Sequence, residues 1–232
     1  YAELWHEYKV LKDKTKRTVA KPGVLGCGYM LSAGHEFENE RTGEIEATGL
    51  LGYAWNMGVK LTLEQSAQSV DVFRDTYIEV PEYWAEIDQA ARRCSSTGKP
   101  DEAGPVEFDR YLQYFKPSLQ MKTMPWGKKK LAICYEGLND KKKWGLISTH
   151  PGKLTENADQ AISRDLLAHG MLLARNEGLD IRLHVHDQIV AQAPEDRAEE
   201  QLKILIECME QPPRWAPDLP LGAEGFIDRI FR

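Results

Sequence analysis

The sequence predicts an α+β fold, and the order of its periodic segments is the reason. Helical patterns fill most of the first 105 residues. Two segments of alternating apolar residues, at 129–150 and 181–192, follow and are interleaved with further helical patterns. Strands that come after helices and read as hairpins favour α+β over an alternating parallel α/β sheet.

The first half of the chain is predicted to be mainly helical. Residues 1–29 show a helical pattern with a break, and residues 34–60, rich in glycine and charge, are predicted to be a loop or insertion. A capping box with Thr62 as N-cap predicts the next helix. Pro81 is predicted to begin another helix, and residues 94–105 have the composition of a linker.

The second half is predicted to alternate hairpins with helices. A hairpin is predicted at 129–150, and the strongest helix pattern runs from Thr155 to Asn176, with Gly178 as its stop. A second hairpin follows at 181–192. Pro194 is predicted to open the last helix.

Composition places the chain among globular proteins. Of its 232 residues, 42% are hydrophobic and 28% charged, and no apolar run is long enough to cross a membrane. The four cysteines are far apart and form no CxxC pair. These features favour a cytoplasmic protein with free thiols over a disulfide framework or a zinc ribbon.

The net charge of −6 argues mildly against a nucleic-acid partner, but the charge is uneven. Lysine and arginine crowd residues 9–21, and two further clusters lie at 128–130 and 141–143. Each run taken alone is best explained as a solvated face. Three runs in an acidic chain support the hypothesis of a local basic track.

The hairpin at 181–192 carries the densest candidate chemistry. Asp187 is predicted at its tip, where a rigid turn could hold a divalent cation. On a strand, His184 and His186 would share a face, so a zinc site completed by another histidine is an alternative. A purely structural turn is a third interpretation, and the hairpin sequence alone leaves all three open.

Four residues near the N-terminus recur every four positions and would form one helix stripe: Arg17, Lys21, Leu25 and Tyr29. The two cations could grip a triphosphate and the tyrosine could cover a base. The alternative is a solvated basic face followed by a glycine-rich loop. A third candidate pairs Asn157 with Gln160, either as a capping box or as amides facing a nucleic-acid minor groove.

The order of these three motifs resembles family A DNA polymerases, the DNA polymerase I class. Arg17-x3-Lys21-x7-Tyr29 resembles motif B of the fingers helix, and Val185-His186-Asp187 resembles motif C of the palm. Residues 144–167 and 215–225 are most similar to bacteriophage members. The resemblance covers nearly the whole chain.

The resemblance implies the C-terminal part of a right-hand polymerase, with helical fingers and part of an antiparallel palm sheet. Residues 1–105 would be a fingers-type helical subdomain, with the insertion at about 34–60, and residues 106–232 the C-terminal palm portion. Such a protein extends a primer–template DNA with deoxynucleoside triphosphates by two-metal catalysis with Mg²⁺. A viral member would act in the host cytoplasm.

The resemblance also assigns roles to residues. Asp187 would bind Mg²⁺, while Arg17 and Lys21 would hold the triphosphate and Lys21 would give a proton to the leaving pyrophosphate. Leu25 and Tyr29 would lie at the nucleotide.

DNA contacts follow from the same likeness. His186 would lie near the primer terminus, and Gln160 with Asn157 would contact the primer–template minor groove.

The chain departs from the family pattern at several positions. Gln188 stands where the family has a second acidic residue. Pro22 follows Lys21 directly, which predicts that the fingers helix kinks or begins there. Leu25 stands where many relatives carry an aromatic residue, and the glycine of the usual Tyr-Gly pair comes first, as Gly28-Tyr29.

No Asp-Tyr/Phe-Ser string, the pattern of motif A, precedes Arg17. We therefore expect an upstream polymerase portion or a second subunit to carry motif A, the thumb and any exonuclease, and we expect no synthesis by this chain alone. The alternatives are a single-subunit RNA polymerase fragment and a metal-dependent hydrolase that uses His184, His186 and Asp187.

Overall fold

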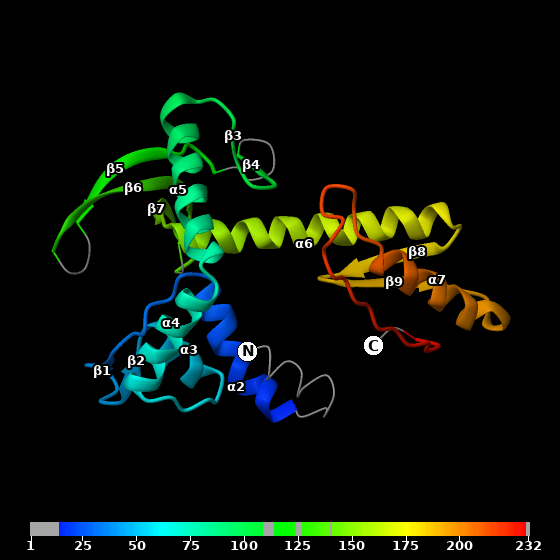
Figure 1. Cartoon of the computed structure of the whole chain (residues 1–232), viewed down its shortest axis with the longest axis horizontal. Coiled ribbons are helices and arrows are strands. Elements are labelled where there is room, and N and C mark those ends of the chain that lie inside the picture. Colours follow the sequence, from blue (N-terminus) through cyan, green and yellow to red (C-terminus); the bar gives the residue numbers. More distant parts are fainter. Residues whose placement is uncertain (1–13, 109–113, 124–126, 140, 231–232) are drawn as a thin grey trace. The chain divides into compact units, whose positions relative to one another are not determined.

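In a computed structural model of the chain, the described residues are 14–108, 114–123, 127–139 and 141–230, with side chains described from residue 20 onward (Figure 1). They form two compact units that divide between Asn157 and Ala158. The boundary predicted near residue 105 concerned polymerase subdomains and stays a prediction.

Helices dominate the first part of the first unit: α2 (Lys14–Gly28), α3 (Gly49–Asn56), α4 (Leu63–Thr76) and α5 (Glu79–Thr97). Cys27, Leu50 and Val70 form a buried cluster where α2, α3 and α4 meet, with Phe73 packed against it. Burial of these apolar side chains is the main stabilising contribution at this junction.

The loop predicted over 34–60 is wrong in part. Strands β1 (Glu36–Glu38) and β2 (Ile45–Ala47) form a short antiparallel hairpin, and α3 follows directly. Leu50, Leu51 and Ala54 on α3 are fully buried. A helix that is buried on several sides is apolar all round, so it lacks the periodicity that would have revealed it.

The helix predicted from the Thr62 capping box is confirmed as α4. The Gln65 backbone N–H donates to Thr62 Oγ1 over 3.1 Å, and the Thr62 N–H donates to Gln65 Oε1 over 2.9 Å. The helix predicted from Pro81 is α5, which begins two residues earlier, at Glu79.

The linker predicted at 94–105 is wrong. Helix α5 continues to Thr97 and ends at Gly98, which has a left-handed φ of 67°. Strands β3 (Asp101–Ala103) and β4 (Val106–Phe108) then form a hairpin. Its small residues resemble a linker, but Ala103, Val106 and Phe108 are buried.

A three-stranded antiparallel sheet completes the first unit: β5 (Ser118–Thr123), β6 (Lys129–Leu138) and β7 (Trp144–Thr149), in that order. The hairpin predicted at 129–150 is confirmed as β6 and β7. Strand β5 was not predicted from the sequence, although Leu119 and Met121 alternate with polar residues along it. Ile133 and Cys134 are the most deeply buried side chains of β6.

The second unit contains most of α6 (Pro151–Asn176), the hairpin β8 (Asp180–Val185) and β9 (Gln188–Gln192), the short helix η1 (Glu195–Arg197) and α7 (Ala198–Glu210). Its core is Ala174, Leu179, Ile189, Leu205 and Cys208. The helix predicted from Thr155 to Asn176 is confirmed as α6, which begins four residues earlier and stops before Gly178. The second predicted hairpin and the last predicted helix are also confirmed, as β8–β9 and α7.

Every strand pair in the described part of the chain is antiparallel, and the small sheets are interleaved with helices along the chain. The α+β class is therefore confirmed. No described helix combines the length and the apolar character that crossing a membrane requires.

Candidate functional site

The tip of the second hairpin is a two-residue turn formed by His186 and Asp187. Val185 pairs with Gln188, which leaves only these two residues between the strands. His186 has a left-handed φ of 55°. Tight hairpins favour that conformation at the turn, and histidine is one of the few non-glycine residues enriched in it. Both turn side chains are exposed. The prediction that a carboxylate lies at the tip of the hairpin is therefore confirmed.

The zinc alternative required His184 and His186 to lie on one strand face. Strand β8 ends at Val185, so His184 belongs to the strand and His186 to the turn. The alternation of strand side chains therefore does not extend to His186. Within the described residues, no three His, Cys, Asp or Glu side chains are grouped so that they could hold a metal ion.

The helix predicted to carry the nucleotide-binding stripe is α2. Lys21 is exposed, and Leu25 and Tyr29 are half-buried. Arg17 lies on the helix, but its side chain is outside the described part.

The expected start of the helix at Pro22 is wrong, because α2 runs from Lys14 through Pro22 to Gly28. A proline inside a helix removes one backbone donor. Here the Pro22 ring is fully buried, and this burial offsets the loss.

Tyr29 ends α2 in a Schellman motif. The Leu31 N–H donates to the Gly26 carbonyl over 2.9 Å and the Met30 N–H donates to the Cys27 carbonyl over 3.1 Å, while Met30 is left-handed with φ 66°. Trp84 Nε1 on α5 also donates to the Gly28 carbonyl over 3.0 Å. The backbone at Tyr29 is therefore held from two sides.

Gly152, in the first turn of α6, touches the same segment and was missed by the sequence reasoning. A Cβ atom added at Gly152 would lie 2.1 Å from the Tyr29 carbonyl oxygen and 2.6 Å from Met30 Cβ. Only glycine permits this approach. Its position beside Pro151, before a polar helix, was the one available signal.

Asn157 makes a contact within the chain that the sequence did not predict. Helix α6 begins at Pro151, so the capping box with Gln160 is wrong, and Asn157 lies inside the helix. Its Nδ2 donates to Tyr114 Oη over 2.7 Å. Tyr114 stacks on Tyr135 of β6, with ring centroids 4.4 Å apart. Burial raises the pKa of the Tyr114 phenol, so it stays neutral beyond its usual range.

The predicted site residues fall in two groups. Lys21, Leu25, Tyr29 and Asn157 belong to the first unit, and the exposed Gln160 belongs to the second together with His186 and Asp187. Nothing in the sequence indicated that Trp84 supports Tyr29, because the two residues lie more than 50 positions apart.

Cys27 lies beside the stripe but has no reactive character. Burial raises the pKa of its thiol to about 11, against a smaller opposing effect of Arg74. The thiolate is the reactive form, so this cysteine is a core residue.

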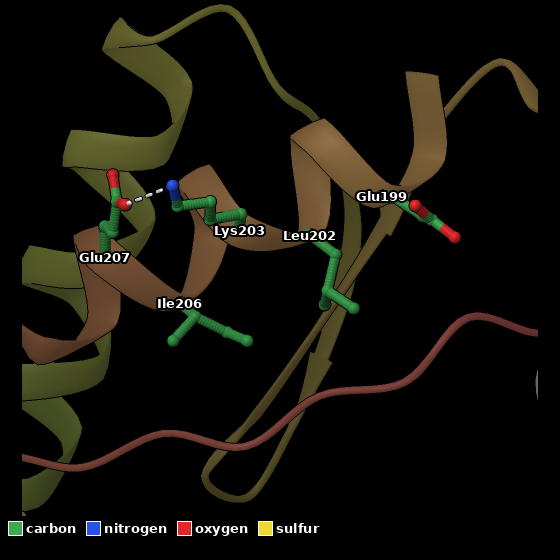
Figure 2. A pocket seen from close by; sticks show the side chains of 5 residues that line it. All are labelled: Glu199, Leu202, Lys203, Ile206 and Glu207. Carbon is green, nitrogen blue, oxygen red and sulfur yellow. Dashed lines mark ion pairs between the residues drawn. The ribbon is translucent and has the colours of Figure 1, made fainter. Parts of the chain in front are cut away.

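A shallow depression of about 380 Å³ lies on α7 in the second unit (Figure 2). Leu202 and Ile206 form its floor, and Glu199, Lys203 and Glu207 surround them. Lys203 faces Glu207 at 3.9 Å. This depression does not suit a phosphate ligand, because its two carboxylates repel an anion and its lysine already faces one of them.

Comparison with known proteins relates the chain to a phage protein. No family model matches the chain. A protein named DNA polymerase from Bacillus phage SP02 is 32% identical over 193 residues, which covers 77% of this chain and 29% of the phage protein. The chain therefore spans less than a third of the length of this relative. It is related to a phage DNA polymerase.

Proposed function

We propose that the chain is the C-terminal portion of a family A DNA polymerase and takes part in transfer of deoxynucleotides to a primer 3′ end. One observation carries the proposal: a two-residue hairpin turn presents Asp187 to solvent, in a chain whose relative is named DNA polymerase. An exposed carboxylate at the tip of a hairpin is available to an incoming ligand.

The role of Asp187 is to supply one oxygen ligand to Mg²⁺. When bound, two Mg²⁺ ions would stabilise the attacking and leaving oxygens of an in-line displacement. The described residues fit a shared site rather than a complete one, because no three ligand side chains meet among them. Gln188 is a neutral neighbour and adds no charge.

On α2, Arg17 and Lys21 would hold the triphosphate. Lys21 is exposed on the helix, where its ammonium can reach a phosphate and can pass a proton to the leaving pyrophosphate. Leu25 and Tyr29 follow on the same stripe and would contact the nucleotide. Support of the Tyr29 backbone by Trp84 and Gly152 would fix the end of that stripe.

Three residues would contact primer–template DNA. His186 would lie near the primer terminus, since it shares the turn with Asp187. Gln160 and Asn157 would contact the minor groove, where amides can both donate and accept. The Tyr114 bond engages one N–H group of Asn157, and its carbonyl oxygen can still accept from DNA.

A partner portion completes the proposal. Since the chain spans 29% of its relative, we propose that an upstream portion or a second subunit provides motif A, the thumb and any exonuclease. In a phage, the whole polymerase would work in the host cytoplasm.

The test is primer extension with Mg²⁺ by this chain combined with the upstream polymerase portion. Asp187→Asn should lower the extension rate by more than about 100-fold, because even outer-shell partners of a metal cost 10–100-fold when lost. Asp196→Asn is the control, since Asp196 is an exposed carboxylate of the same unit outside the hairpin. Equal extension by the Asp187→Asn and control variants would refute the proposal.

The same assay separates the other functions. Preference for ribonucleotides would point to a single-subunit RNA polymerase. Hydrolase activity that needs zinc and His184 would point to the metal-dependent hydrolase.

A further inference from the structure

The three-stranded sheet is strongly basic, although the whole chain is acidic. Residues 114–149 contain eight lysines and only two carboxylates, whereas the whole chain has a net charge of −6. Two groups of lysines flank β6: Lys128–Lys130 at its start and Lys141–Lys143 just after its end. At about 3.3 Å per residue, these groups are about 30 Å apart.

Backbone hydrogen bonds fix the second group in space. Asn139 Oδ1 accepts from the backbone N–H groups of Lys141 and Lys143, each over 3.0 Å. The Asn139 N–H donates to the Lys143 carbonyl over 2.9 Å. The turn is therefore held by backbone groups and by Asn139, and none of these bonds uses a lysine side chain.

Two exposed aromatic rings lie next to this turn. Trp144 is 61% exposed and Phe115 is 55% exposed, and their ring centroids are 5.9 Å apart in an edge-on arrangement. Leu138, the cross-strand partner of Trp144, is 62% exposed. Lys116 lies over the Phe115 ring at 5.1 Å. The same Lys116 ammonium lies 3.1 Å from Glu136 Oε1. Exposed rings beside a run of lysines in the sequence match a ligand that is both anionic and flat.

The other end of the sheet holds an unfavourable charge pair. Lys122 and Lys130 are directly opposite on β5 and β6, and therefore share a face. Neither has an acidic partner within 4.0 Å among the described residues. Like charges directly opposite each other destabilise a sheet, so an anion bound between the two lysines would reduce their repulsion.

We propose that this sheet binds single-stranded DNA, with unpaired bases stacked on Trp144 and Phe115 and the backbone following the two lysine groups. Stacking on aromatic rings with a basic surface beside them is the way in which unpaired strands are bound without sequence preference. The choice of DNA as the ligand rests on the proposed function. The sheet would then hold an unpaired stretch of the template strand.

The first test measures binding of the full chain to a fluorescent oligodeoxythymidine of about 16 nucleotides, by anisotropy at several salt concentrations. Changing Lys141, Lys142 and Lys143 together to Gln should weaken binding and lower the slope of log Kd against log salt by about 2, since each phosphate contact contributes about 0.7. The matched control changes three exposed lysines outside the sheet, Lys60, Lys99 and Lys203, to Gln.

The second test addresses stacking. Trp144→Ala should weaken binding about 10-fold, while Trp215→Ala, which removes a tryptophan that is 51% exposed in the other unit, should leave it unchanged. Circular dichroism of each variant checks that the fold is kept.

Three outcomes overturn the inference. The first is that the sheet variants and the control variants weaken binding equally. The second is that duplex DNA binds more tightly than the single strand and Trp144→Ala has no effect, and the third is that RNA of the same length binds more tightly than the DNA. The binding assay uses neither nucleotide nor metal. Its failure is thus distinct from a failure of the Asp187 test, which measures extension only.

Discussion

At the residue scale, Gly152 is the tightest contact beside the proposed nucleotide site. An added Cβ would lie 2.1 Å from the Tyr29 carbonyl oxygen, a distance that requires the backbone to move. We expect Gly152→Ala to lower the free energy of unfolding by about 1–3 kcal/mol, as overpacking does, measured by urea denaturation.

Gly23→Ala is the matched control for that change. Gly23 lies inside α2, and a Cβ there would meet nothing within 4 Å. Alanine is the better helix former, so this variant should be more stable by about 0.5–1 kcal/mol. The same sign for both variants would contradict the contact between Gly152 and Tyr29.

The buried thiol of Cys27 makes the first unit sensitive to high pH. Its pKa is raised from 9.0 to about 11 by burial, so the folded state favours the neutral thiol. This contribution to stability is complete below pH 9 and is lost as the pH rises through 11. The free energy of unfolding should therefore fall more steeply between pH 9 and 11 in the parent than in Cys27→Ala. Parallel pH profiles would show that Cys27 ionises freely in the folded protein.

At the element scale, the register of β5 against β6 creates a repulsion that a single change can test. Lys130→Glu would place opposite charges across from Lys122, and should raise the free energy of unfolding by about 0.2–1 kcal/mol. Lys129→Glu is the control, because its cross-strand partner is Thr123. Thermal unfolding measures both, and a lower midpoint for Lys130→Glu would contradict the register.

The elements also show which sequence signals are reliable. The Thr62 capping box and the alternation in β6 and β7 predicted their elements because each signal is local. The α3 helix and the β3–β4 hairpin were missed because their burial depends on partners distant in sequence. Pro22 was judged by its backbone alone, whereas its buried ring decides that α2 continues.

At the scale of the whole molecule, the chain should not form a complete magnesium site. Among the described residues, Asp187 has no neighbouring pair of acidic or histidine ligands. We expect the isolated chain to have the same thermal unfolding midpoint in MgCl₂ as in NaCl of equal ionic strength. The reason is that a ligand stabilises a protein only if it binds the folded state. A rise specific to Mg²⁺ that Asp187→Asn removes would show that the chain holds the ion by itself.

The sequence by itself determined the α+β class, the hairpin turn at His186 and Asp187 and the relation to phage DNA polymerases, because each depends on local pattern or on ordered motifs. Only the tertiary structure decided that Asn157 bonds to Tyr114, that Gly152 and Trp84 support the end of α2, and that Lys122 faces Lys130. These contacts join residues separated along the chain, and their distances depend on packing that no local pattern encodes.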